Sequence, residues 1–281
     1  MRIRNAALFI VMWLCAIVLG GAADDKNKYG AIEVVSQPNS AVVYIEGFPA
    51  GEAPVRVDQV LPGPYRVVVK GPSLGDFVKD IQVTAGEIAK VEASLLPDAG
   101  SPHSIVREQS DWTPLVGKDK KRYEKATSTQ PLRGYKVLEI GNFLVKSDDT
   151  VPPDHLYALF RDLAKHLDKK TKFEQFVTNY TKGPSAKWAE SSADAEGPTL
   201  ILTGVITQYE RGNRAERYFF GFGAGTSRTY CLFRLVDKAT NEVLLERMDN
   251  GSVSGGLFGG GSAGAMNELA EHIAKSIEKN W

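Results

Sequence analysis

The sequence predicts two domains: an all-β sandwich, followed by an α+β domain with an antiparallel-rich sheet and two helices. Three observations predict this class. Residues 29–96 contain short apolar runs separated by turn residues and show no helical period. Residues 134–281 combine longer strand-like runs with two stretches that repeat apolar residues at helical spacing. Residues 97–133 lie between them and are rich in Pro, Ser, Gly and charged residues, as is typical of a linker.

The first 23 residues have the pattern of a secretory signal peptide. Arg2 and Arg4 precede an apolar run from Ala6 to Leu19, and small residues follow up to Ala23. The run is shorter than the roughly 20 residues that a membrane-spanning helix needs. We therefore expect cleavage after Ala23, export to the periplasm or cell envelope, and at most peripheral membrane contact. An uncleaved N-terminal anchor is the alternative.

The charge and the cysteine content argue against a nucleic-acid partner and against an internal disulfide. The chain has 34 basic and 34 acidic residues, so no nucleic-acid partner is expected. Cys15 lies in the signal peptide, and Cys231 then has no partner for an internal disulfide. Because Cys231 lies in the apolar run Tyr230–Phe233, we expect it to be buried as a small hydrophobic residue.

The first domain is predicted to contain only strands. Its apolar residues alternate with polar ones, and turn residues such as Pro38–Ser40 and Leu61–Pro64 separate the runs. Strands are expected at 31–35, 42–46, 55–57 and 65–70, around Phe77–Val83, and from Ala89 to Leu95.

Three short motifs in this domain carry a family resemblance. The turn Pro38-Asn39-Ser40-Ala41 leads into Val43-Tyr44-Ile45-Glu46-Gly47, and Leu61-Pro62-Gly63-Pro64-Tyr65 begins a later Val-rich strand. On these motifs, the stretch from Ile32 to Leu95 resembles the PEGA domain family. Its Pro-Glu-Gly-Ala turn differs here at the middle two residues, but Asn and Ser also favour turns. The resemblance implies a small non-catalytic β-domain of an envelope protein and indicates no ligand.

The second domain, residues 134–281, alternates strands and helices. A strand at 135–145 precedes a helix that begins near Pro153, and a short strand is expected at 172–177. Three strands follow at 199–209, 227–236 and 242–248, and a last helix begins near Gly264. This half is similar to uncharacterised bacterial envelope domains often found on lipoproteins. More distantly, it is similar to the α/β core of the curli-secretion channel lipoprotein. Neither resemblance carries over a catalytic residue.

No motif in the chain predicts catalysis. Residues 259–264 match G-x-G-x-x-G, but no second strand with an acidic residue follows, so a dinucleotide site is not expected. The four histidines are scattered, with Glu268 and His272 one turn apart on the last helix. We therefore expect no catalytic residue, no cofactor, no metal and no enzyme activity.

Two glycine-aromatic segments, 218–225 and 255–261, are the candidate binding site. If the strands at 199–209, 227–236 and 242–250 form an up-and-down meander, the segments that follow the first and third strands lie at the same end of the sheet. Two alternatives remain open: the aromatic residues fold into the core, or the chain turns at Asn250-Gly251, which is a strong hairpin signal. The predicted partner-binding residues are Tyr218, Phe219, Phe220, Phe222, Leu257 and Phe258.

Three functional hypotheses follow. The first is a non-enzymatic module that binds an envelope protein or a cell-surface component. The second is an accessory subunit of an outer-membrane export or assembly complex, which would form a homo-oligomer. The third is an envelope hydrolase with an unrecognised site, for which the polar segment from Thr178 to Pro198 leaves room.

Overall fold

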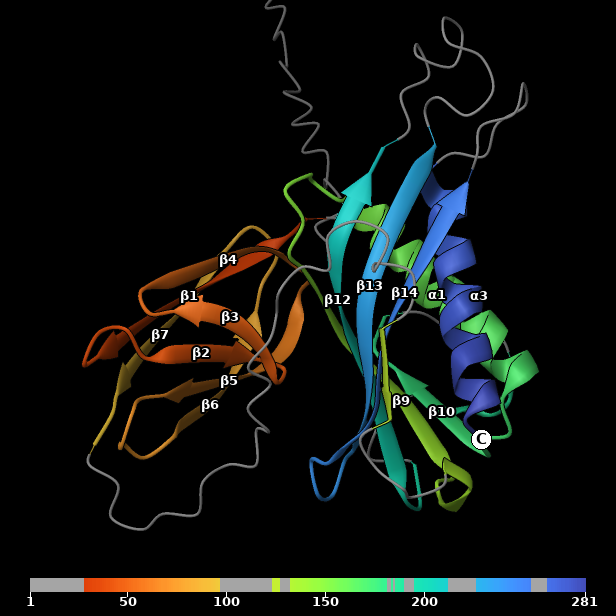
Figure 1. The fold of residues 1–281 in the computed structure, drawn as a ribbon, viewed down its shortest axis with the longest axis horizontal. Coiled ribbons are helices and arrows are strands. Elements are labelled where there is room, and N and C mark those ends of the chain that lie inside the picture. Colours follow the sequence, from red (N-terminus) through yellow and green to blue (C-terminus); the bar gives the residue numbers. More distant parts are fainter. Residues whose placement is uncertain are drawn as a thin grey trace, which may run out of the picture.

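A computed structural model describes most of the chain after the predicted signal peptide. The described residues are 28–96, 123–126, 132–180, 183, 185–189, 195–211, 226–253 and 262–281. They form three layers: an N-terminal β-sandwich, a long mixed sheet, and two helices on the far side of that sheet (Figure 1).

The N-terminal sandwich confirms the predicted all-β domain. Its core is built from alternate residues of each strand, such as Val43 and Ile45 or Val67 and Val69, which are completely buried. The strand at 48–52 was not predicted, because its Pro and Gly interrupt the strand pattern. One sheet has the order β4 (Val55–Val60), β1 (Gly30–Gln37), β7 (Ile88–Ser94); the other has the order β3 (Phe48–Glu52), β2 (Val42–Ile45), β5 (Gly63–Lys70), β6 (Phe77–Val83).

The second sheet is mixed. Its antiparallel part contains β12 (Thr199–Glu210), β13 (Ser227–Asp237), β14 (Val243–Val253) and β8 (Tyr123–Ala126). Its parallel part contains β9 (Val137–Val145), β10 (Gln175–Thr178) and β11 (Trp188–Ala189), with β9 also parallel to β12. Strand β8 and the first two residues of the short 3-10 helix η3 (Leu132–Gly134) lie within the stretch expected to be a linker.

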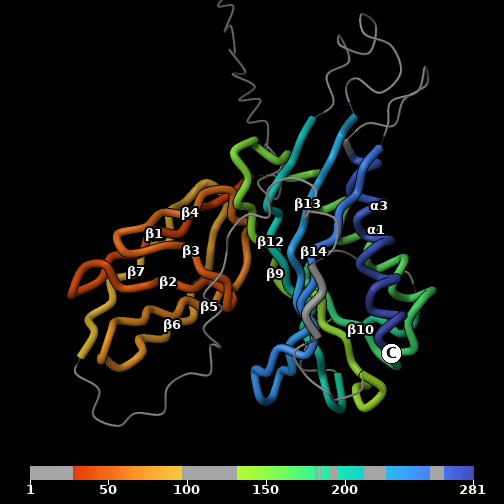
Figure 2. Tube along the Cα trace, viewed as in Figure 1, coloured from red at the N-terminus to blue at the C-terminus, as the bar shows by residue number. Residues whose placement is uncertain are grey.

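Two helices cover one face of this sheet, as the sequence predicts. Helix α1 (Pro153–Lys170) begins after Pro152, and its predicted stripe, which includes Leu159 and Leu163, is completely buried. Helix α3 (Ser262–Lys279) packs beside α1 (Figure 2). Its residues Leu269, Ile273 and Ile277 are completely buried. The segment β9–α1–β10 is a crossover between parallel strands, which a helix between them makes geometrically feasible.

Both faces of the sheet are buried. On β13, Cys231, Phe233 and Leu235 belong to the core under the helices, whereas Leu232 belongs to the core of the sandwich side. The sequence of β13 is therefore a nearly continuous apolar run. Because both faces of the strand are buried, polar residues do not alternate with apolar ones. Cys231 is completely buried, as expected, and burial raises the pKa of its thiol.

Candidate functional site

The ends of three strands meet at one end of the sheet. Glu210, the last residue of β12, pairs with Arg228 at the start of β13, and Ser227 pairs with Val253, the last residue of β14. The strands therefore run up, down and up, and the segments 212–225 and 254–261 both connect to this end (Figure 1). The six predicted partner-binding residues all belong to these two segments, and they lie outside the described residues.

The start of the sandwich lies at the same end. The Tyr29 hydroxyl donates to the Val151 carbonyl oxygen at 2.8 Å, just before α1. On α1, His155 Nδ1 lies 2.7 Å from the Tyr209 hydroxyl on β12. Burial lowers the pKa of His155 and raises that of Tyr29. The chain therefore enters the described fold beside the last residues of β12.

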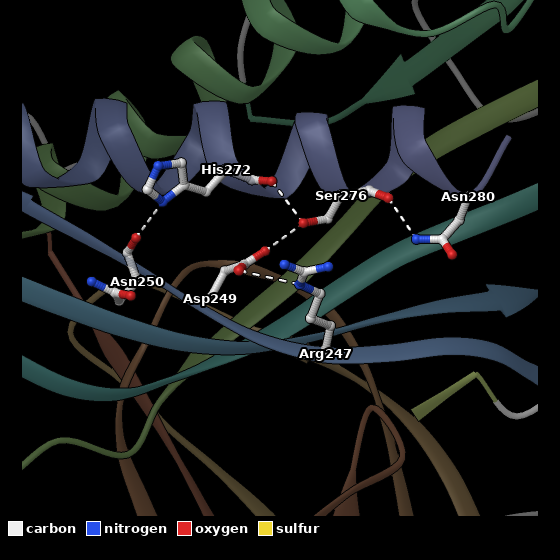
Figure 3. A network of polar contacts seen from close by, with 6 residues as sticks. All are labelled: Arg247, Asp249, Asn250, His272, Ser276 and Asn280. Atoms are coloured by element: carbon white, nitrogen blue, oxygen red, sulfur yellow. Dashed lines mark hydrogen bonds and ion pairs between the residues drawn. The ribbon is translucent and has the colours of Figure 1, made fainter. Parts of the chain in front are cut away.

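Helix α3 binds the outer edge of β14 (Figure 3). Strand β8 pairs with β14 only from Leu245 to Met248. Beyond it, His272 Nδ1 donates to the Asn250 carbonyl oxygen at 2.7 Å, and the Glu268 carboxylate accepts from the Ser252 N–H. These side chains satisfy edge groups that would otherwise be open to another strand. Glu268 and His272, which the sequence placed one turn apart, thus each bind backbone.

Gly251 makes this close approach feasible. It lies within β14, so the chain does not turn at Asn250-Gly251, and the hairpin alternative is wrong. A Cβ atom on Gly251 would lie 1.9 Å from the Ala265 carbonyl oxygen and 2.5 Å from the Leu269 nitrogen. The glycine is required because the α3 backbone packs directly on the strand.

The Ser276, His272 and Asp249 side chains of this contact are not arranged as a nucleophile and its base. The Ser276 hydroxyl donates directly to Asp249 Oδ2 at 2.6 Å, and Arg247 Nε lies 3.2 Å from Asp249 Oδ1 (Figure 3). His272 Nδ1 donates to the Asn250 carbonyl oxygen and does not accept a hydrogen bond from the Ser276 hydroxyl. In nucleophilic catalysis the histidine would accept the proton of the serine, so this arrangement differs from that of a nucleophile and its base. The network joins helix to strand.

The described part of the chain contains neither a cluster of metal-binding side chains nor a membrane-spanning helix. Within it, no group of three or more His, Cys, Asp or Glu residues gathers closely enough to hold a metal ion. None of its helices combines the length and the apolar character that crossing a bilayer demands.

The turn between β2 and β3 joins the sandwich to the sheet. The Gly47 carbonyl oxygen accepts from Arg234 Nη1 at 2.9 Å, and Arg234 Cζ lies 4.4 Å from the centre of the Phe48 ring. Arg234 Nε also donates to Glu246 Oε2 at 2.6 Å, with the two side chains 5% and 0% exposed. Burial raises the pKa of Glu46 in the same turn, although hydrogen bonds from the Arg66 backbone and from Asn142 oppose the shift. The buried ion pair between Arg234 and Glu246 thus lies beneath this turn.

The sandwich that carries this turn matches a known family. The family model described as PEGA domain matches residues 29–98. Residues 29–98 form a PEGA domain. Residues 180–278 match a second model, described as a domain of unknown function (DUF4410). No curated protein is similar in sequence to the chain.

Several solved structures resemble about half of the chain. The PelC dodecamer from Paraburkholderia phytofirmans has 12% identity and a TM-score of 0.37, covering 54% of this chain and 95% of that one. The hypothetical protein CT253 from Chlamydia trachomatis has 11% identity and a TM-score of 0.32, covering 52% and 97%. A minor lipoprotein from Acinetobacter baumannii has 13% identity and a TM-score of 0.30, covering 52% and 94%.

The contact between the PEGA domain and the sheet was not predicted from the sequence, but a signal for it exists. Arg234 and Glu246 are charged residues inside apolar runs, and they lie at equal distances on either side of Thr240 in the turn. A hairpin centred on Thr240 places them opposite each other, as the structure confirms. An Arg and a Glu at facing positions of two buried strands indicate a buried ion pair. Gly47, whose carbonyl oxygen accepts a hydrogen bond from Arg234, belongs to the PEGA motif.

Proposed function

We propose that this chain is an exported, non-enzymatic protein of the bacterial envelope that binds an envelope protein or a cell-surface component. The binding surface is the sheet end at which β12 and β14 finish and β13 begins. One observation carries the proposal: the two glycine-aromatic segments, 218–225 and 255–261, belong to the stretches 212–225 and 254–261, which both connect to this end.

The composition of these segments supports binding. Segment 212–225 contains Tyr218, Phe219, Phe220 and Phe222, and segment 254–261 contains Leu257 and Phe258. Large aromatic side chains contribute most of the binding energy in many protein interfaces, and neighbouring glycines let a partner approach the backbone. Two such segments attached to adjacent strand ends supply enough residues for one continuous surface.

The envelope location is supported by the N-terminal sequence and by the PEGA domain. The positive start, the apolar run from Ala6 to Leu19 and the small residues up to Ala23 are typical of export. A small β-domain that matches the PEGA family model follows this segment. Both features agree with a binding module on the outer side of the inner membrane.

Site-specific photocrosslinking in native envelopes tests the proposal. The photoreactive residue replaces Arg228 at the start of β13, and the matched control replaces Ala239, which follows the opposite end of the same strand. We expect Arg228 to crosslink to one envelope partner, identified by mass spectrometry, and Ala239 to give none. Equal crosslinking from both positions would contradict the proposed surface. Crosslinks only between copies of the chain would favour the homo-oligomeric export subunit.

Substitution then tests the aromatic residues themselves. Phe220→Ser and Phe258→Ser are expected to reduce the Arg228 crosslink while leaving the circular dichroism spectrum and the unfolding midpoint unchanged. Loss of the folded state in both variants would show that these residues belong to the core instead, and the binding surface would then have to lie elsewhere.

A further inference from the structure

The loop between β9 and α1, residues 146–152, lies between the PEGA domain and the end of β12 (Figure 1). Near the end of this bridging loop, Val151 is completely buried. The Val151 N–H donates to Gln59 Oε1 at 2.8 Å, and the Val151 carbonyl oxygen accepts from the Tyr29 hydroxyl at 2.8 Å. Gln59 and Tyr29 both belong to the PEGA domain, so both polar backbone groups of Val151 are bound by that domain.

The conformation of the bridging loop depends on these two bonds. A buried backbone N–H or carbonyl group that lacks a partner costs free energy comparable to a lost hydrogen bond. The Val151 side chain packs in the core under the helices, which keeps its backbone away from water. The second domain therefore needs Gln59 and Tyr29 of the PEGA domain to hold this loop in place.

The other end of the bridging loop holds β12. Strand β9 pairs with β12 up to Ile206, which lies opposite Val145, the last residue of β9. Beyond this point, the Lys146 N–H donates to the Ile206 carbonyl oxygen at 2.8 Å, and the Tyr209 N–H donates to Ser147 Oγ at 3.1 Å. The bridging loop thus takes the place of β9 along the last residues of β12, and it satisfies an N–H at the strand edge.

The first turn of α1 adds a side-chain contact to the same strand end. The His155 N–H donates to the carbonyl oxygen of Pro152, the last residue of the bridging loop, at 2.9 Å. His155 Nδ1 lies 2.7 Å from the hydroxyl of Tyr209, which is 1% exposed. Tyr209 is therefore held through its backbone by the loop and through its hydroxyl by α1, so its position follows that of the loop.

We propose that Gln59 and Tyr29 are positioning residues, through which the PEGA domain fixes the bridging loop, the end of β12 and thereby the binding surface. The last step rests on the proposed function, because β12 ends at that surface. Two hydrogen bonds connect the PEGA domain to Val151, so the loss of a single acceptor or hydroxyl should be enough to loosen the loop.

Hydrogen exchange of residues 24–281, followed by mass spectrometry, tests the positioning. Gln59→Met removes the acceptor of the Val151 N–H, whereas Gln59→Glu keeps an acceptor oxygen there. We expect Gln59→Met to speed exchange of the Val151 amide roughly tenfold and to speed exchange of the Tyr209 amide as well, because both bonds depend on the loop. Tyr29→Phe should act in the same direction, and Gln59→Glu should exchange like the wild type.

Tyr135→Phe is the matched control. The Tyr135 hydroxyl donates to Oδ2 of Asp237, the last residue of β13, at 2.6 Å, at the opposite end of the sheet. This variant loses a hydrogen bond of the same kind, and it should leave the loop amide and the β12 amide unchanged. If it accelerated both amides as much as Tyr29→Phe, the effect would be a general loss of stability and the positioning role would be overturned. A faster loop amide without a faster β12 amide in Gln59→Met would also overturn it.

The photocrosslink from Arg228, which pairs with the last residue of β12, separates this inference from the proposed function. Where the wild type crosslinks to its partner, Gln59→Met should reduce the yield and Gln59→Glu should restore it. An unchanged yield despite faster exchange at Tyr209 would overturn the role of the PEGA domain at the binding surface. Absence of any crosslink in the wild type would contradict the proposed function instead, and the exchange rates would still decide whether Gln59 and Tyr29 hold the end of β12.

Discussion

Replacing Gly251 with alanine tests how closely α3 packs on β14. The new Cβ atom would lie 1.9 Å from the Ala265 carbonyl oxygen, against an ordinary contact distance of about 3.5 Å. The helix must therefore move away by about 1.5 Å at this turn, because the obstructing atoms are backbone and cannot rotate aside.

The cost of that movement has two parts. Overpacking in a tight site typically costs about 1–3 kcal/mol. The hydrogen bond from His272 to Asn250 is 2.7 Å long, and a shift of this size stretches it beyond bonding distance. The same movement breaks the hydrogen bond from the Ser252 N–H to the Glu268 carboxylate. The loss of each of these two hydrogen bonds costs about 1 kcal/mol. Together these contributions predict that the free energy of unfolding falls by about 3–5 kcal/mol.

Urea denaturation followed by circular dichroism measures this change. Gly134→Ala is the matched control, because no atom lies within 4 Å of its added Cβ, and its stability should change by about 0.5 kcal/mol or less. If Gly251→Ala also changed stability by less than about 0.5 kcal/mol, the close approach of α3 to β14 would be refuted.

Two further predictions concern the ionisable groups. Arg234→Met leaves Glu246 without its buried 2.6 Å partner, so we expect a loss of about 3–5 kcal/mol in urea denaturation, whereas Arg56→Met, in an exposed pair with Asp58, should cost at most about 1 kcal/mol. Equal losses would contradict the burial of the pair. Because burial lowers the pKa of His155 below its ordinary value of about 6.5, the unfolded chain binds the proton first as the pH falls, and stability should decline below about pH 6.5. Thermal unfolding at pH 7.5 and 5.5 should show a smaller decline in His155→Gln, and an identical decline would count against this assignment.

The candidate site was predicted in part. Alternation and turn residues indicated where β12, β13 and β14 run, and this was enough to place their ends together. The Asn250-Gly251 pair was the misleading signal, because a glycine required by a neighbouring helix reads the same in sequence as one required by a turn. The roles of Glu268 and His272 were missed, since backbone acceptors and donors on a distant strand leave no sequence motif.

The sequence by itself determined the local elements: the sandwich strands, the apolar stripes of α1 and α3, and the turn around Thr240. These depend on periodicity and turn chemistry within a few residues. Only the tertiary structure decided that β9 pairs parallel with β10 and β12, that β8 joins the edge of the sheet, and that Arg234 lies beneath Gly47. These contacts join segments far apart in the chain, and which of them form depends on burying both faces of one sheet at once, a condition that no local pattern records.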